Sequence, residues 1–250
     1  MAIGLEYDGS RFLGWQTQSG GGTVQDAVEA ALGGVAASRV GVTCAGRTDS
    51  GVHASLQVAH FDTDAERPDS AWVRGANALL PDAVVVLWSK AVPGDFHARY
   101  SATTRTYRYR LLNRPVRPAL GRQHLGWYHR PLDVARMRDA AAALVGEHDF
   151  SAFRSSECQA KSPVRTIREF RVEEKPEGRI DFVVRANAFL HHMVRNLVGT
   201  LVYVGKGSFL PLQVREILLA KDRGKAAPTF GPEGLYLETV EYAPQWGLPT

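Results

Sequence analysis

Apolar positions recur along this chain at two periods, and the two periods predict strands and helices in alternation. Alternating or continuous apolar positions predict strands over residues 2–7, 56–63, 83–92, 105–112, 166–174, 179–186 and 235–242. Apolar positions at helical spacing predict helices over residues 24–35, 71–80, 134–144, 188–204 and 212–220. A few antiparallel strands with two or more helices in each half favour an α+β fold of two lobes.

Local signals refine these elements. Thr23 precedes the first helix and Asp26 follows three residues later, which predicts an N-cap. The glycines before Thr23 suggest a phosphate-binding loop, but no GK[ST] sequence follows, so this interpretation is disfavoured. Residues 93–100 are the expected joint between an N-terminal lobe, 1–96, and a C-terminal lobe, 97–250.

Charge is distributed unevenly, although the formal net charge is only +4. The window 97–130 contains eight arginines and no Asp or Glu. A preference for arginine codons would explain the 24 Arg against 6 Lys in the chain, but not the local absence of acids. An acid-free arginine block beside aromatic residues predicts nucleic-acid binding, because guanidinium groups bind phosphates and stack on bases.

Composition also excludes several classes of protein. No run of 18 apolar residues exists and the N-terminus lacks a signal peptide, so a cytoplasmic protein without a membrane span is expected. Cys44 and Cys158 are the only cysteines, which excludes a cysteine-based zinc site. The adjacent His191 and His192 would point about 100° apart on a helix, so they would rarely bind one ion and no metal is expected. No cofactor is expected either.

The central stretch of the chain is residues 44–54, where a predicted strand breaks into a turn bounded by Gly46 and Gly51. Between the glycines lie Arg47 and Asp49. A strand that ends in a tight, charged turn can present a carboxylate to a ligand. A solvated turn with a local Arg47–Asp49 pair fits the spacing equally well.

The nonapeptide GRTDSGVHA at residues 46–54 resembles the signature GRTDxGVH[AG] of the tRNA pseudouridine synthase A (TruA) family. Other segments resemble further family motifs, so the similarity extends over nearly the whole chain. These segments are YDGSRFLGWQ (7–16), NALLP (77–81), DFHARY (95–100), RTYRY (105–109), NAFLHHMVRN (187–196) and EGLYL (233–237).

The resemblance implies an enzyme that isomerises uridine to pseudouridine at positions 38, 39 and 40 of the tRNA anticodon stem-loop. It also implies a homodimer of two-lobed subunits, in which two mainly antiparallel sheets join across a central basic cleft. Asp49 would be the nucleophile, and a carboxylate can form a covalent intermediate without a cofactor.

The resemblance assigns roles to other residues as well. Arg195 would pair with the catalytic carboxylate and Arg47 would help to extrude the target base, although the residues themselves do not distinguish these two roles. Tyr107 would stack on the base. Tyr109 shares its strand face, so strand period alone does not choose between the two tyrosines.

Four further residues are candidates for substrate binding. Leu235 would line the base pocket, although a place in the core of its strand fits as well. Arg105, Arg108 and Arg110 belong to the arginine block and are candidate RNA contacts. By strand period, Arg108 and Arg110 face away from Tyr107.

Two functions of other classes remain open from the residues alone. A non-catalytic RNA-binding protein would explain the arginine block, but it has no need of a carboxylate in an arginine-lined site. A metal-dependent hydrolase that uses Asp49 and His53 would need further ligands, which the sequence does not supply.

Overall fold

The structure is a computed structural model that describes residues 1–249. It has an α+β fold with a mixed, open sheet, and the described residues include five α-helices. The chain divides into two compact units, of which the first contains Met1–Arg105 with the described residues from Tyr236 onward. The second unit contains Thr106–Leu235.

In the first unit the strand order is β4–β1–β3–β10, with the short β2 paired to β3. These strands are β1 (Ala2–Tyr7), β2 (Thr43–Cys44), β3 (His53–His60), β4 (Val84–Lys90) and β10 (Leu235–Tyr242). Strand β1 is antiparallel to β3 and β4, whereas β10 is parallel to β3 through Tyr236 and Leu237. The described residues from Tyr236 onward therefore belong to the first unit, although they lie far from its other residues in the sequence.

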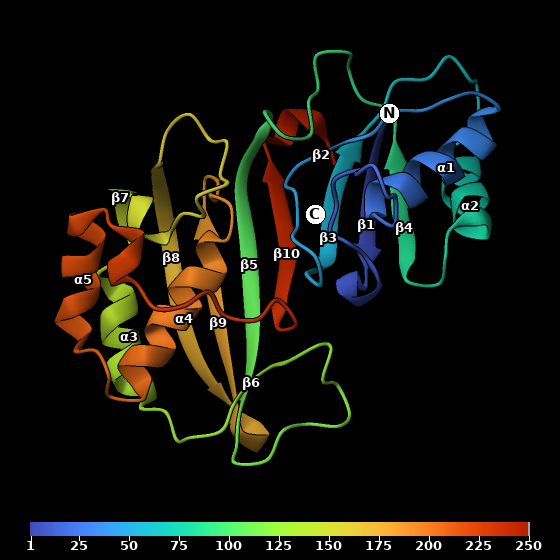
Figure 1. Ribbon diagram of the computed structural model, residues 1–250. Helices are drawn as coiled ribbons and strands as arrows, with labels where there is room; N and C mark the ends of the chain where they lie inside the picture. The colour runs from blue at the N-terminus through green and yellow to red at the C-terminus, as the bar shows by residue number, and fades with distance from the viewer. Residues whose placement is uncertain (250) are drawn as a thin grey trace. The chain divides into compact units, whose positions relative to one another are not determined.

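The helices of the first unit are α1 (Val24–Ala36) and α2 (Asp69–Leu79), which pack on each other, and α2 also packs on β4 (Figure 1). The N-cap predicted for α1 is confirmed. The Thr23 hydroxyl accepts from the Asp26 amide at 3.2 Å, and the Asp26 carboxylate accepts from the Thr23 amide at 3.2 Å. This reciprocal pair satisfies two amides that the first helical turn leaves without intrahelical partners.

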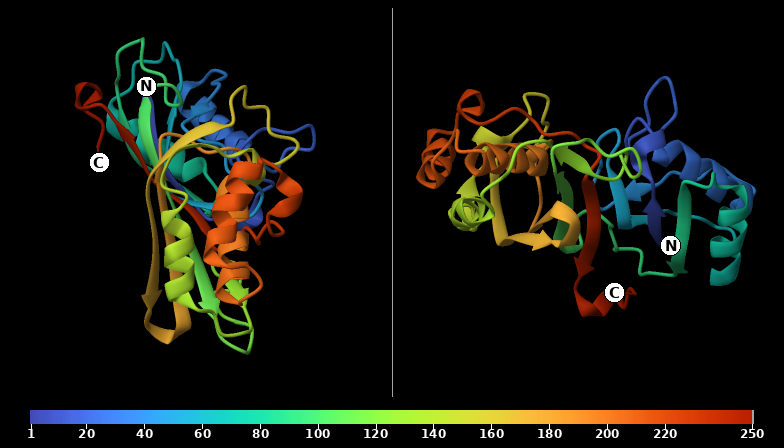
Figure 2. Two further views of the ribbon diagram at one scale, coloured as in Figure 1. Left: turned by 90° about the vertical axis from the view of Figure 1, so that its left-hand side faces the viewer. Right: turned by 90° about the horizontal axis from the view of Figure 1, so that it is seen from below.

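In the second unit the strand order is β5–β9–β8–β7, and β6 is parallel to β5. The strands are β5 (Ala102–Asn113), β6 (Gly126–Tyr128), β7 (Gly146–Asp149), β8 (Val164–Lys175) and β9 (Arg179–Ala186). Helices α3 (Val134–Ala142), α4 (Met193–Gly205) and α5 (Pro211–Ala220) gather on one face of these strands (Figure 2). Apolar side chains of α4, including Leu197 and Leu201, are fully buried and form the core of this unit.

The predicted bounds of β9 and β10 are confirmed, but the predicted start of the helix at 188 is wrong. His192 has a left-handed backbone, with φ 62° and ψ 2°, and α4 begins only at Met193. The apolar residues Phe189 and Leu190 extend the helical pattern into an irregular segment, which is followed by a turn at His191 and His192. In the part of the chain that the structure describes, no helix is long and apolar enough to cross a membrane.

Candidate functional site

The turn that carries Asp49 begins where β2 ends. Strand β2 stops at Cys44 and the segment from Ala45 to Val52 is not part of a strand, so strand alternation does not place Arg47 and Asp49. Arg47 is exposed, Asp49 is partly exposed, and Thr48 between them is buried. The buried Thr48 therefore anchors the turn, while the charged side chains of Arg47 and Asp49 on either side of it are accessible to solvent.

Hydrogen bonds fix the backbone on both sides of the Asp49 side chain. The Trp15 amide donates to the Thr48 carbonyl at 3.0 Å, and the Val52 amide donates to the Asp49 carbonyl at 3.1 Å. The Thr48 hydroxyl lies 2.8 Å from the Tyr7 hydroxyl in a buried hydrogen bond. Trp15 itself is a core residue, since it is 1 % exposed. The carboxylate is thus carried by backbone that has little freedom to move.

Two glycines let the segment after β1 lie directly on this turn. A Cβ atom on Gly9 would lie 1.9 Å from the Val52 carbonyl oxygen, and one on Gly14 would lie 2.9 Å from that of Thr48. Gly14 also has φ +96°, a conformation that side chains disfavour. The motif at residues 7–16 therefore has a structural role, since its glycines let this segment lie close against the turn that carries Asp49.

Gln57 and Arg105 hold the start of the turn. The Gln57 amide group donates to the Gly46 carbonyl at 2.6 Å and accepts from the Gly46 amide at 3.3 Å. Arg105 is 7 % exposed and donates to the Ala45 carbonyl at 3.0 Å. Sequence reasoning missed Tyr7 and Gln57, because neither side chain carries an obvious chemistry and both act through long-range contacts.

In the second unit, the structure distinguishes Tyr107 from Tyr109. Tyr109 is fully buried, its hydroxyl donates to the Gly231 carbonyl at 2.9 Å, and burial raises the pKa of this phenol above its ordinary value. Tyr107 is 8 % exposed and meets Phe189 edge to face, with ring centroids 5.0 Å apart. Tyr109 is therefore a core residue, and Tyr107 is the tyrosine that remains a candidate for base stacking.

The arginine block has members in different environments. Arg108 donates to the Asp181 carboxylate at 3.0 Å, and Asp181 is 2 % exposed. Arg110 is partly exposed, and its amide donates to the Gly234 carbonyl at 2.8 Å. Arg114 is exposed in the loop that follows β5. A phosphate contact by Arg108 would have to share its guanidinium with this ion pair.

Arg195 lies in the first turn of α4 and is partly exposed. Its Nε donates to the Phe230 carbonyl at 2.9 Å, and the Phe230 amide donates back to the Arg195 carbonyl at 3.3 Å. These bonds tie the start of α4 to the segment before β10. Leu235 is 5 % exposed. Its amide donates a hydrogen bond to the Pro232 carbonyl at 2.9 Å, so a tight turn sets its position.

Comparisons with known proteins agree with this arrangement of motifs. The family model for tRNA pseudouridine synthase matches residues 4–101 and 140–243 of the chain. The interval between these ranges contains most of the arginine block.

Curated relatives match over the full length of the chain. The tRNA pseudouridine synthase A of Dechloromonas aromatica is 57% identical over 249 residues, which cover 100% of this chain and 95% of the relative. The protein of the same name from Chromobacterium violaceum is 56% identical, with the same coverage. That from Burkholderia thailandensis is 55% identical over 100% of this chain and 92% of the relative.

Proposed function

Because the chain belongs to the tRNA pseudouridine synthase family and isomerises uridine to pseudouridine in tRNA, we propose that Asp49 is the nucleophile of this reaction. The isomerisation breaks the bond between the uracil nitrogen and the ribose, turns the base and rejoins it through carbon. A carboxylate can carry the substrate covalently between these two steps and leave unchanged at the end.

The observation that carries this proposal is the fixed backbone on both sides of Asp49. The Thr48 and Asp49 carbonyls each accept a hydrogen bond, from Trp15 and Val52 respectively. A nucleophile held in place before the substrate arrives loses less entropy in the transition state, which lowers the barrier. A solvated surface turn has no need of these contacts, and its aspartate would not sit beside a buried Tyr7–Thr48 hydrogen bond.

We also propose that Arg47 and Arg195 act in the same reaction. A guanidinium near a carboxylate favours the ionised form, which the attack requires. Arg47 is exposed two residues before Asp49, and this position suits a side chain that moves into the space left by an extruded base. Arg195 is held at Nε by Phe230, which leaves the planar end of the guanidinium oriented.

Tyr107 is proposed to stack on the target base. Base–aromatic stacking contributes about 1–3 kcal/mol per base. The edge contact with Phe189 holds the Tyr107 ring, and the core position of Tyr109 excludes that tyrosine from the role. Leu235 is proposed to supply an apolar wall of the base pocket, because the turn from Pro232 fixes it.

The arginine block is proposed to bind the anticodon stem-loop of tRNA, with the uridines at positions 38, 39 and 40 as targets. Arg110 and Arg114 are proposed phosphate contacts, and Arg108 contributes beside its ion pair with Asp181. Arg105 is a proposed positioning residue because it holds the Ala45 carbonyl, and its direct contact with substrate stays a prediction. The homodimer, the cytoplasmic location and the absence of a cofactor also stay predictions.

The experiment that tests the proposed function is pseudouridine mapping in unmodified tRNA after incubation with the purified protein. Substrates in which uridine 38, 39 or 40 is replaced by cytidine identify the target. We expect pseudouridine at these positions and loss of the signal at each replaced one. Pseudouridine confined to another arm of the tRNA would contradict the assignment to the anticodon stem-loop.

A further inference from the structure

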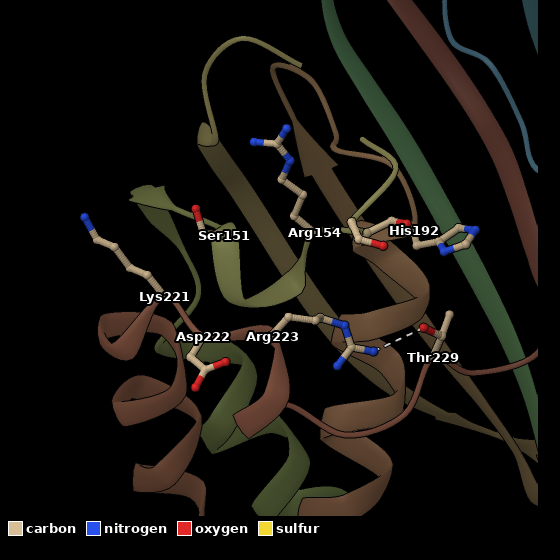
Figure 3. A pocket seen from close by; sticks show the side chains of 9 residues that line it. Ser151, Arg154, His192, Lys221, Asp222, Arg223 and Thr229 are labelled. Atoms are coloured by element: carbon tan, nitrogen blue, oxygen red, sulfur yellow. Dashed lines mark hydrogen bonds between the residues drawn. The ribbon is translucent and has the colours of Figure 1, made fainter. Parts of the chain in front are cut away.

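A cavity of about 570 Å³ opens in the second unit, among residues that are given no role above (Figure 3). It is lined by the short helix η2 (Ser151–Phe153) with the loop after it, by the residue before α4, by the segment after α5, and by Thr229. Its basic side chains are Arg154, His192, Lys221 and Arg223, against the single carboxylate of Asp222. The lining is therefore strongly biased toward positive charge.

Arg223 donates hydrogen bonds only to neutral oxygens in the described part of the chain. Its acceptors are the carbonyls of Ala226 and Ala227, at 3.4 and 2.9 Å, and the side chains of Asn196 and Thr229, at 3.1 and 3.2 Å. Burial lowers the pKa of Arg223 below its ordinary value, the direction expected for a cation that gives up water without gaining an anion. The guanidinium is thus fixed, while its charge is not neutralised.

Asn196 is the residue that fixes Arg223. Its side chain is fully buried, donates to the Phe153 carbonyl at 2.8 Å and accepts from the Thr229 hydroxyl at 2.6 Å. The same oxygen accepts from Arg223. This network joins η2, α4 and the segment after α5, so the three parts of the lining hold one geometry.

The other charged groups leave two guanidinium groups for a ligand. Lys221 lies 3.0 Å from the Asp149 carboxylate, which neutralises it. The Asp222 carboxylate accepts from the Gly224 amide at 2.8 Å and points away from the Arg223 guanidinium in Figure 3. Arg154 donates to the carbonyl of Cys158, another neutral partner. Arg154 and Arg223 therefore line one cavity without a carboxylate bound to either.

We propose that this pocket binds a backbone phosphate of the tRNA substrate through Arg154 and Arg223. Guanidinium groups match the oxygens of a phosphate in charge and in fork geometry. The inference rests on the proposed function, since tRNA supplies the phosphate. The pocket would be a second RNA contact, outside the arginine block. One of its lining residues, His192, lies three residues before Arg195 in the chain.

The test compares tRNA binding by Arg154→Gln, Arg223→Gln and the control Arg215→Gln, each measured over a range of salt concentrations. Arg215 is an exposed arginine of α5 that does not line the cavity. Each pocket variant should raise the Kd about 5-fold or more and reduce the slope of log affinity against log salt by about 0.7–0.9, as one lost phosphate contact requires. The control should change neither quantity. Arg154 is tested separately because Arg223→Gln also disturbs the Asn196 network.

A thermodynamic cycle that combines a modified RNA with a protein variant identifies which phosphate is bound. Anticodon stem-loop RNAs that each carry one uncharged methylphosphonate are titrated against the wild type and Arg223→Gln. One methylphosphonate should weaken wild-type binding and add nothing to the loss in Arg223→Gln, since both changes remove the same contact. Inorganic phosphate is titrated at constant ionic strength as a second probe.

The inference is overturned if both pocket variants bind tRNA with the wild-type Kd and salt slope. It is also overturned if inorganic phosphate binds in the pocket while RNA affinity is unchanged in the variants. Pseudouridine formation by the wild type is recorded in the same preparations. Activity with unaltered RNA binding in the variants would reject the pocket alone, whereas absence of activity would reject the proposed function.

Discussion

Gly14 lies against Thr48 so closely that a Cβ atom at Gly14 would be 2.9 Å from the Thr48 carbonyl oxygen. The residue after Gly14 completes the contact, because the Trp15 amide donates to that same oxygen. The position of Asp49 thus depends on a close approach by the backbone of Gly14, which lies 35 residues earlier in the chain. This relationship leads to the first prediction.

Gly14→Ala should slow the chemical step. The new methyl group would clash with Thr48 and would impose strain at φ +96°, so the turn would shift by a fraction of an ångström or more. Misplacement of a reacting group by about 1 Å can cost about 100-fold in rate, and we expect a loss of about 10- to 100-fold in the single-turnover rate.

The control for this prediction is Gly20→Ala. Gly20 belongs to the loop before α1, and nothing lies within 4 Å of a Cβ placed there. Its rate should stay close to that of the wild type. Equal rates for Gly14→Ala and the wild type would show that the segment at 7–16 does not position Asp49.

Substitutions at Tyr107 and Tyr109 should affect different properties, namely turnover for Tyr107 and the stability of the fold for Tyr109. Tyr109→Phe removes a buried hydroxyl that donates to Gly231, so it should lower the free energy of unfolding by about 1 kcal/mol. Tyr107→Ala should leave the salt dependence of tRNA binding unchanged and cause a large loss of turnover, because it would remove the proposed stack on one extruded base. Denaturant titrations and single-turnover rates measure the two effects, and a turnover loss confined to Tyr109→Phe would reverse the assignment.

Arg108→Ala should destabilise the protein. The substitution would leave the Asp181 carboxylate, which is 2 % exposed, with Arg179 as its remaining ion-pair partner, at 3.1 Å. Removing one partner of a buried ion pair typically costs about 3–5 kcal/mol, and the retained Arg179 ion pair and the partial exposure of Arg108 bring our expectation to about 1–2 kcal/mol.

The matched variant is the double substitution Arg108→Ala with Asp181→Asn, which removes both charges. It should recover part of the lost stability, since the buried carboxylate is removed and Arg179, whose side chain is 43% exposed, stays in contact with water. Urea titrations measure the three free energies of unfolding. A single Arg108→Ala variant as stable as the wild type would show that the ion pair contributes nothing.

Stability should fall as the pH is lowered through the range in which histidine titrates. Burial lowers the pKa of His60 below its ordinary value of 6.5, and the nearby His97 lowers it further. The unfolded chain therefore binds a proton at a higher pH than the folded chain, so acidification from above 6.5 favours unfolding until the folded His60 also titrates. The Ala98 amide also donates to His60 Nδ1 at 3.1 Å, a bond that protonation at this nitrogen would break.

His60→Gln should reduce this pH dependence, whereas His129→Gln at an exposed position should not. Melting temperatures between about pH 8 and pH 5 provide the measurement, since an unperturbed histidine titrates near 6.5. An identical pH dependence in wild type and His60→Gln would assign the effect to another group.

The parts of the fold that follow from local pattern could be predicted from the sequence. The N-cap at Thr23 and the bounds of β9 and β10 depend on short-range signals, and the structure confirms them. Strands β6 and β7 have three and four residues and form by pairing with β5 and β8, so periodicity does not reveal them.

The candidate site shows the same division. The motif around Asp49 predicts which residue is the nucleophile, but it does not predict the contacts of Tyr7, Gly14 or Gln57 that hold the turn. The pairing of Arg108 with Asp181 joins residues 73 positions apart, and the fixation of Arg223 by Asn196 spans 27. Such contacts depend on tertiary packing, which has no local signature. The left-handed backbone of His192 similarly interrupts a helical pattern that its apolar neighbours continue.

The central claim is that Asp49 is the nucleophile, and Asp49→Asn tests it most directly because the substitution removes the charge with little change in volume. Pseudouridine formation in a single turnover and tRNA binding are measured on the same preparation. We predict that activity falls below about one per cent of the wild type while the Kd for tRNA stays within about 3-fold, as expected when a nucleophile is lost and the binding surface is kept. Pseudouridine formation by Asp49→Asn at a rate comparable to that of the wild type would contradict the account.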